Sequence, residues 1–187
     1  MKYTIERTSQ FKKDFKLAEK QGLDLDELKG EKEMYDIRIA TKEDIDILMS
    51  SRLEMLRVVN DLSDDYDFSE EMINESRDYF LNGDHLTILA MDGNDVIGCS
   101  SISFIRMMPT FDHITGKRAH LMNVYTKREY RHQGIARRMV QLLIEESWKA
   151  GATEISLDAT ELGRPLYESL GFIDSAECMV LAREKYD

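Results

Sequence analysis

Apolar residues recur along this chain with two spacings, which predict strands and helices in alternation. A period of two predicts strands at 35–40, 86–91, 96–104, 119–126 and 154–158. A spacing of three to four predicts helices at 41–59, 69–81 and about 135–150. In the first of these helices the expected inward residues are Ile45, Leu48, Met49, Leu53, Leu56 and Val59.

Short polar signals predict where several elements begin and end. Thr41, with Asp44 three residues later, is typical of a helix N-cap. The run 92–95, Asp-Gly-Asn-Asp, predicts a tight hairpin turn. Pro165 suits the first turn of a short helix from Arg164 to about Leu170. Residues 172–173 and 178–181 are expected to close the chain as β-structure.

The first 35 residues differ in composition from the rest of the chain. They predict a strand at 3–6 and a helix from Ser9 that carries Phe11 and Phe15 on one face, followed by a polar linker at 29–33. We therefore expect an N-terminal extension, 1–35, and a main domain, 36–187. The order of elements in the main domain predicts a mixed α/β fold.

Composition limits the class of protein. With 42% hydrophobic and 33% charged residues, the 187-residue chain has the composition of a soluble globular protein. No run reaches the roughly 18 apolar residues of a membrane-spanning helix, and the N-terminus has no apolar signal segment. The two cysteines, Cys99 and Cys178, lie in apolar strand-like runs, where burial is expected. Two thiols make no disulfide framework or metal cluster, so we expect a reducing cytoplasm.

The net charge of −11 is concentrated in the main domain. Residues 1–35 contain eight Lys or Arg and eight Asp or Glu, so the whole excess of acid lies in 36–187. An acidic body argues against a nucleic-acid partner, since such binding depends on neutralising phosphates. It is compatible with a cationic small molecule or a basic peptide.

One strand–helix junction carries candidate chemistry. The strand that ends at 124–126 is followed by Arg131-x-x-Gly134-x-Ala136 at the start of a helix. Free N–H groups and the partial positive charge at a helix N-terminus bind phosphate oxygens. Small residues at 134 and 136 would let a diphosphate approach, and Arg131 and Arg137 add charge. On spacing alone, an ordinary strand–turn–helix junction explains the pattern equally well.

The wider sequence resembles a known family. Residues 123–137 resemble the acetyl-CoA-binding motif of the GNAT superfamily of N-acetyltransferases, Gln/Arg-x-x-Gly-x-Gly/Ala. Residues 164–172 resemble the late Tyr…Gly-Phe segment of that family, and the order of elements from 36 to about 181 is similar. The resemblance implies a mixed, mostly antiparallel sheet flanked by helices. It also implies transfer of an acetyl group from acetyl-CoA to a primary amine.

The resemblance also implies which residues hold the cofactor. The backbone of Val124 and Thr126 would pair with the pantetheine arm, and the amides from Gln133 to Arg137 would hold the pyrophosphate. The implied cofactor-binding residues are Val124, Tyr125, Thr126, Arg131, His132, Gln133, Gly134, Ile135, Ala136, Arg137, Thr160 and Arg164.

Two residues are candidates for proton transfer. Tyr167 matches the family position whose phenol protonates the departing thiolate, although a core aromatic would explain it as well. His120 lies four residues before Val124 and on a regular strand would share its face. An imidazole can accept a proton near neutral pH, so His120 is a candidate base. Glu161, Asp158 and a water chain remain alternatives, as does a purely structural histidine.

The acceptor and partners are less defined by the sequence. The acidic loop at 60–67 contains Asp64 and Asp65, which could attract a cationic acceptor such as a polyamine, an aminoglycoside or a lysine-bearing peptide, or could simply be solvated. Many relatives pair through C-terminal strands, so a homodimer is an expectation from resemblance. The alternative to an enzyme is a non-catalytic acyl-CoA-binding module. Acetyl transfer to charged tRNA conflicts with the acidic main domain.

The N-terminal extension resembles a different family. Residues 1–30 are similar to the opening strand and helix of bacterial RelE-type mRNA-interferase toxins. The remaining sheet that would carry their ribonuclease residues is missing, so no nuclease activity is expected. Two interpretations of this segment remain: it is a relic of a gene fusion, or it is a docking element.

Overall fold

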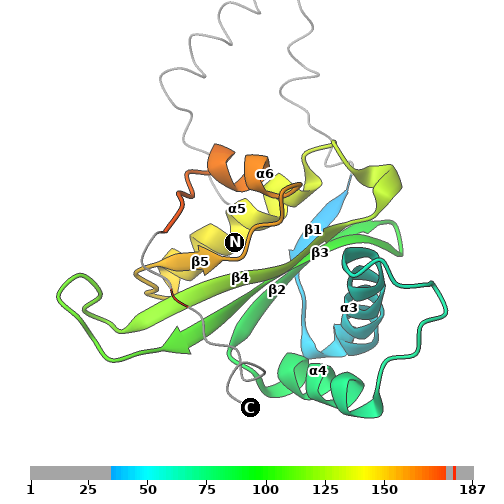
Figure 1. Cartoon of the computed structure of the whole chain (residues 1–187), viewed down its shortest axis with the longest axis horizontal. Coiled ribbons are helices and arrows are strands. Elements are labelled where there is room, and N and C mark those ends of the chain that lie inside the picture. Colours follow the sequence, from blue (N-terminus) through cyan, green and yellow to red (C-terminus); the bar gives the residue numbers. More distant parts are fainter. Residues whose placement is uncertain (1–34, 176–178, 180–187) are drawn as a thin grey trace, which may run out of the picture. The chain divides into compact units, whose positions relative to one another are not determined.

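The main domain is built on one five-stranded sheet. The computed structural model describes residues 35–175 and residue 179 (Figure 1). The strands lie in the order β1 (Asp36–Ile39), β2 (His85–Asp92), β3 (Asp95–Arg106), β4 (Lys117–Thr126) and β5 (Ile155–Leu157). The first four are antiparallel, and β5 pairs with β4 in parallel. The predicted mixed, mostly antiparallel α/β fold is confirmed.

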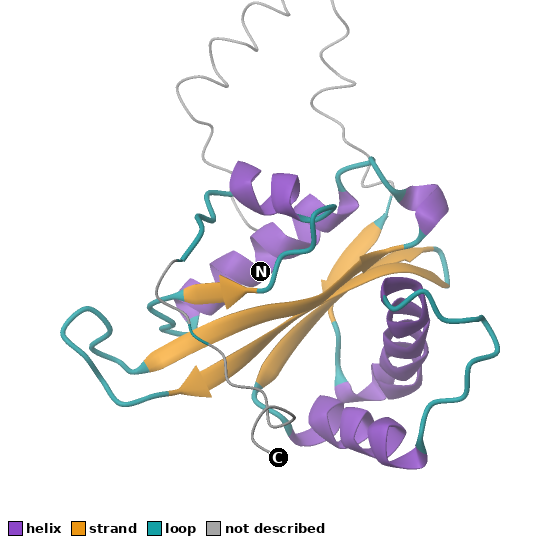
Figure 2. Cartoon of the chain, viewed as in Figure 1, coloured by secondary structure: helices purple, strands orange, loops and turns teal. Residues whose placement is uncertain are grey.

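Helices cover both faces of this sheet (Figure 2). One face carries α3 (Ile45–Val59), which follows a 3-10 turn η1 (Lys42–Asp44), and α4 (Glu70–Asn82). The other face carries α5 (Ile135–Lys149), which packs on β2, β3 and β4. A second 3-10 turn, η2 (Arg128–Tyr130), precedes α5, and α6 (Arg164–Ser169) follows β5.

Alternation along β3 divides the core between the two faces. Cys99 belongs to the hydrophobic cluster under α3 and α4, together with Leu89 and Tyr125. Its neighbour Gly98 faces α5, since a Cβ there would come within 3.1 Å of the Met139 side chain. Cys99 is buried as expected, and burial raises the pKa of its thiol to about 12.

Two details of the predicted elements are wrong. Val59, expected to face inward, is 58% exposed, whereas Met55 is buried. The predicted strand at 172–173 is a helix ending instead: Gly171 has a φ of +94°, and the N–H of Phe172 donates to the carbonyl of Tyr167. A left-handed glycine followed by this backward hydrogen bond is the usual end of a helix.

Two sets of expectations concern residues outside the described ones. The N-terminal strand and helix at 1–34 fall there, and so do most of the residues of the closing strand at 178–181. Within 35–175, no helix has both the length and the apolar character needed to cross a membrane.

Candidate active site

A bulge interrupts β4 at the centre of the sheet. On β3, Ser101 pairs with Met122 and Cys99 pairs with Tyr125, so Ser100 faces two residues, Asn123 and Val124. Asn123 has a φ of +55°, a left-handed conformation that asparagine tolerates better than most residues. An extra residue on one strand is a β-bulge, which redirects the side chains on either side of it.

The bulge overturns the expectation that His120 and Val124 share a face. His120 pairs with Ser103, which lies on the same face of β3 as Cys99, the partner of Tyr125. His120 and Tyr125 therefore face α3 and α4, and Val124, next to Tyr125, faces the other way.

Beyond the bulge, one edge of β4 has no partner strand among the described residues. Its parallel pairing with β5 covers only Ala119 to Leu121. The N–H of Lys127 donates to Ile97 of β3 at 2.9 Å, so by alternation the backbone groups of Val124 and Thr126 point to the opposite edge. β4 therefore offers an open backbone edge where β5 has already ended.

The segment that follows this edge forms a tight loop before α5. His132 and Gly134 have φ values of +62° and +78°, and Gly134 is the N-cap of α5. A Cβ added at Gly134 would meet nothing within 4 Å, so the loop surface is open there. The helical ladder begins where the N–H of Arg138 donates to the Gly134 carbonyl at 3.0 Å, so the preceding amides point out of the helix end.

The other residues of the predicted cofactor-binding set differ in burial and in hydrogen bonding. Ile135 is buried, whereas Ala136 is half-buried. Arg131 Nε donates to the Thr126 carbonyl at 3.0 Å, so this carbonyl is already occupied. Gln133 Nε2 donates to the Glu129 carbonyl at 3.4 Å.

Arg137 joins the first turn of α5 to α6. Arg137 donates to Ser169 Oγ at 2.7 Å, which links α5 to α6. Thr160 stabilises the start of α6, because its carbonyl accepts from the N–H of Arg164 at 3.0 Å. The guanidinium of Arg164 forms an ion pair with Asp174 at 2.6 Å, so it is directed to a carboxylate of this chain.

Tyr167 lies on α6 in apolar surroundings. Its ring packs edge-to-face on Phe172 with 6.0 Å between centroids, and a Cβ added at Gly163 would come within 3.0 Å of it. Burial raises the pKa of the Tyr167 phenol. The phenol therefore stays protonated at neutral pH, as a proton donor must.

His120 is held by two polar neighbours. Its Nδ1 lies 2.9 Å from Ser156 Oγ on β5, and its Nε2 lies 3.7 Å from a carboxylate oxygen of Asp158. Ser156 also pairs with His120 in the parallel ladder. The ring therefore sits where β4 and β5 begin to part.

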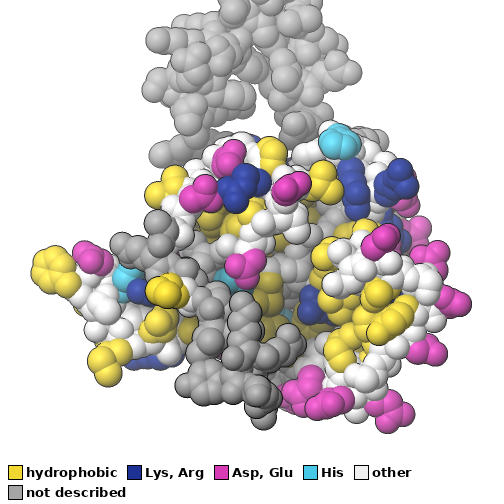
Figure 3. Space-filling view, in the orientation of Figure 1, with side chains coloured by type: hydrophobic (Ala, Val, Ile, Leu, Met, Phe, Trp, Pro, Cys, Tyr) yellow, Lys and Arg dark blue, Asp and Glu magenta, His cyan; other side chains and the backbone are white. Residues whose placement is uncertain are grey.

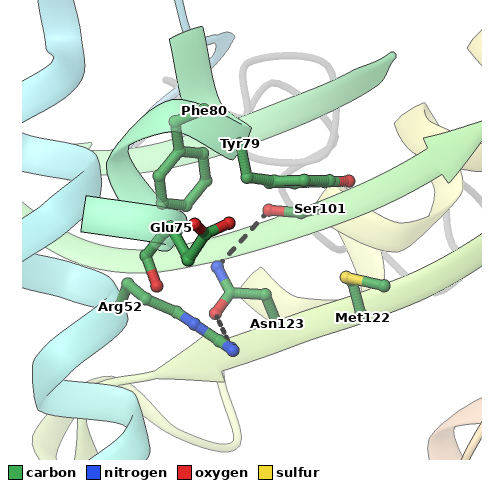
Figure 4. Close-up of a pocket in the computed structure, with 8 residues that line it drawn as sticks. Arg52, Glu75, Tyr79, Phe80, Ser101, Met122 and Asn123 are labelled. Atoms are coloured by element: carbon green, nitrogen blue, oxygen red, sulfur yellow. Dashed lines mark hydrogen bonds between the residues drawn. The ribbon is translucent and has the colours of Figure 1, made fainter. Parts of the chain in front are cut away.

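A cavity of about 350 Å³ opens on the α3/α4 face beside the bulge (Figure 4). Arg52 reaches from α3 to Asn123, whose Oδ1 accepts its hydrogen bond at 3.1 Å. The cavity is lined by Arg52, Glu75, Ser76, Tyr79, Phe80, Ser101, Met122 and Asn123.

Neither Asp64 nor Asp65 lines this cavity. Both are exposed in the loop between α3 and α4, where Ser63 donates to Asp65 and lowers its pKa. Figure 3 shows acidic side chains gathered over this loop and α4, and basic side chains over the segment between β4 and α5. The two regions therefore have opposite charge.

Arg52 and Glu75 are cavity residues that no sequence motif of this chain singles out. Arg52 lies four residues after Leu48 and three before Met55, both of which are buried, so it interrupts an inward-facing stripe. A charged residue within an apolar helical stripe was the available signal.

Comparisons with known proteins agree with this geometry. The acetyltransferase (GNAT) family model matches residues 53–172. A predicted acetyltransferase with acetyl-CoA from Clostridium acetobutylicum is 30% identical, with a TM-score of 0.71 over 81% of this chain and 98% of that one. No curated protein matches the chain.

More distant structures share the fold alone. A GCN5-related N-acetyltransferase from Ralstonia eutropha is 19% identical, with a TM-score of 0.66 over 79% of this chain and 98% of that one. Glucosamine-6-phosphate N-acetyltransferase from Arabidopsis thaliana is 14% identical, with a TM-score of 0.58 over 80% and 98%. The family match spans more than half of the chain and includes the bulge, the open edge of β4 and the loop before α5. The chain therefore belongs to the GNAT family and is an N-acetyltransferase.

Proposed function

We propose that the enzyme transfers an acetyl group from acetyl-CoA directly to a primary amine, carried by a cationic small molecule or a lysine-bearing peptide. The observation that carries this proposal is the open edge of β4 next to the loop before α5. An unpaired strand edge suits an extended amide-containing arm, and outward-pointing helical amides suit a diphosphate.

The residues present fit acetyl-CoA. The backbone of Val124 and the N–H of Thr126 would hold the pantetheine arm, since the Thr126 carbonyl already accepts from Arg131. The amides of 133–137, including that of Gly134, would hold the pyrophosphate, and the open space at Gly134 leaves room for it. When bound, acetyl-CoA supplies a thioester whose carbonyl carbon an amine can attack and whose thiolate can leave.

Tyr167 is the proposed proton donor to the leaving sulfur. Its phenol, with an ordinary pKa of about 10, is protonated at neutral pH, and burial raises that pKa further. No described residue forms a hydrogen bond with its hydroxyl. A hydroxyl without a fixed partner is available to an incoming group.

His120 is the proposed proton acceptor for the attacking amine. Its imidazole lies on the face of β4 that also carries Met122, a residue of the cavity wall. Because His120 does not itself line the cavity, we propose transfer through water, with Asp158 next to its Nε2. A primary amine arrives protonated near neutral pH and must lose a proton before it attacks.

Asp64 and Asp65 are proposed to attract the positive charge of the acceptor. They lie in the acidic region over the α3–α4 loop, on the same face as the cavity. Replacing both by asparagine should raise the KM for a cationic amine and leave kcat unchanged. An unchanged KM would show that the loop is only solvated.

The test of the proposed function is thiol release from acetyl-CoA over a panel of amines, with Tyr167→Phe as the informative variant. We expect kcat to fall about 100-fold or more, with acetyl-CoA affinity unchanged, because only the proton donor is removed. Tyr66→Phe is the matched control, since Tyr66 is exposed in the α3–α4 loop. Acetyl-CoA binding without turnover of any amine would instead indicate a non-catalytic binding module.

A further inference from the structure

Arg52 differs from four arginines of the described chain that form ion pairs with carboxylates. The guanidinium groups of Arg38, Arg77, Arg118 and Arg164 each lie within 4.0 Å of a carboxylate oxygen. Arg52 has no such partner among residues 35–175, although it is more than half buried, and burial lowers its pKa. A guanidinium nevertheless stays charged in proteins, so a positive charge without a counter-ion remains in the cavity wall.

Within the described part of the chain, most donors of Arg52 have no hydrogen-bond partner. One hydrogen bond goes from Nη1 to Asn123 Oδ1, whereas a guanidinium carries five N–H donors. Asn123 is itself oriented, because its Nδ2 donates to Ser101 Oγ at 3.3 Å, and Ser101 Oγ lies 2.8 Å from Thr87 Oγ1. This chain of hydrogen bonds fixes the guanidinium at the cavity wall.

One acidic side chain lines the cavity together with Arg52. Glu75 of α4 lines it and is exposed, and no ion pair joins its carboxylate to the Arg52 guanidinium. The wall therefore presents a positive and a negative group that do not neutralise each other. A ligand with both charges would satisfy both groups.

We propose that the acceptor carries an anionic group, a carboxylate or a phosphate, close to its amine, and that Arg52 binds this group. The inference rests on the proposed function, because it concerns the acceptor of that reaction. A planar guanidinium makes two parallel hydrogen bonds to such oxyanions, which adds orientation to charge attraction. Glu75 holds the ammonium end of the same molecule, and the cavity of about 350 Å³ limits the acceptor to a small molecule or the end of a longer one.

The experiment compares matched amines that differ only in the anionic group. Lysine is paired with cadaverine, and phosphoethanolamine with ethanolamine, so that the two arms separate a carboxylate from a phosphate. For each pair we measure kcat/KM by thiol release and, independently, the Kd in the presence of CoA by calorimetry. We expect at least one anion-bearing member to be preferred about 10- to 100-fold over its partner, the range for a charge-assisted hydrogen bond.

Arg52→Gln should remove this preference by weakening only the anion-bearing member. Arg52→Lys keeps the positive charge but loses the planar pair of N–H donors, so it should give an intermediate preference. This variant also keeps the test valid if Arg52→Gln is unstable. Arg77→Gln is the matched control, because Arg77 lies on α4, is partly exposed and does not line the cavity.

The outcomes separate the two proposals. Equal use of both members of every pair, or a preference that survives Arg52→Gln, overturns the inference and leaves the proposed function standing. Arg52-dependent binding without turnover of any amine keeps the anion site and overturns the proposed reaction. If no anion-bearing amine binds at millimolar concentration, the inference is overturned.

Discussion

Ser100 and Ser101 are adjacent, buried residues of β3 whose hydroxyl groups differ in their hydrogen-bond partners. Ser101 Oγ contacts Thr87 Oγ1 and accepts from Asn123 Nδ2, whereas Ser100 Oγ has no hydrogen-bond partner among the residues that the structure describes. A buried polar atom without a partner destabilises a fold, while a paired one leaves its partners unsatisfied when it is removed.

The pair gives a prediction on stability. Ser100→Ala should leave the free energy of unfolding unchanged or raise it by up to about 1 kcal/mol, and Ser101→Ala should lower it by about 1–3 kcal/mol. Urea unfolding of both variants checks this, and each is the control for the other. Equal effects would mean that Ser100 Oγ has a partner in solution, such as water.

At the scale of single residues, the sequence predicts the role of a residue only where neighbours in the chain decide its conformation. Gly134 follows from its motif, because a left-handed N-cap favours glycine. Arg52 does not, because its importance depends on Asn123, a residue 71 positions away that the fold brings next to it. The relative orientation of His120 and Val124 was missed for the same reason, since the bulge depends on pairing with β3.

At the scale of elements, the start of α3 depends on one carboxylate. Asp44 is buried and accepts from both terminal nitrogens of Arg38, at 2.8 and 2.7 Å, and from the N–H of Thr41 at 2.7 Å. The Arg38 hydrogen bonds, which outweigh the opposing effect of burial, hold the Asp44 pKa well below its usual value.

A pH-dependent stability follows from this site. Because the folded-state pKa is depressed, the stabilisation is present above the unfolded-state pKa, about 4, and is lost as pH falls below it. Asp44→Asn should lower the free energy of unfolding by about 2–3 kcal/mol at pH 7 and flatten its fall below pH 4. Exposed Asp46 on the same helix provides the control, Asp46→Asn, which should show neither effect. A wild-type slope in Asp44→Asn would contradict the assignment.

Most elements were predictable because their signals are local. The hairpin turn at 92–95, the Ser69 cap of α4 and the apolar stripe of α5 each lie within a few residues of the structure that they specify. The prediction of a strand at 172–173 was wrong because an apolar pair after Gly171 is equally compatible with a strand and with the end of α6. The packing of Phe172 on Tyr167 decides between them.

At the scale of the whole domain, one sheet separates two apolar clusters. Leu89 packs under α3 and α4, and Leu143 packs in α5 on the other face, and both are fully buried. Since every strand contributes to both faces, we expect the two clusters to unfold together.

Trp148, the single tryptophan, reports on this coupling from α5. Leu89→Ala and Leu143→Ala should each lower the free energy of unfolding by about 2–5 kcal/mol, measured by Trp148 fluorescence in urea. If Leu89→Ala left the fluorescence transition unmoved, the two faces would be independent.

The bulge in β4 has a consequence for how this enzyme can change over evolution. Two β4 residues, Asn123 and Val124, lie opposite Ser100, so deleting Asn123 would leave Val124 opposite Ser100 and Met122 still opposite Ser101. The other β4 side chains would keep their faces, and the deletion would remove only the side chain that accepts from Arg52. In an alignment of relatives, a gap at Asn123 would therefore mark the loss of this contact in the cavity wall, while the rest of the strand stays in place.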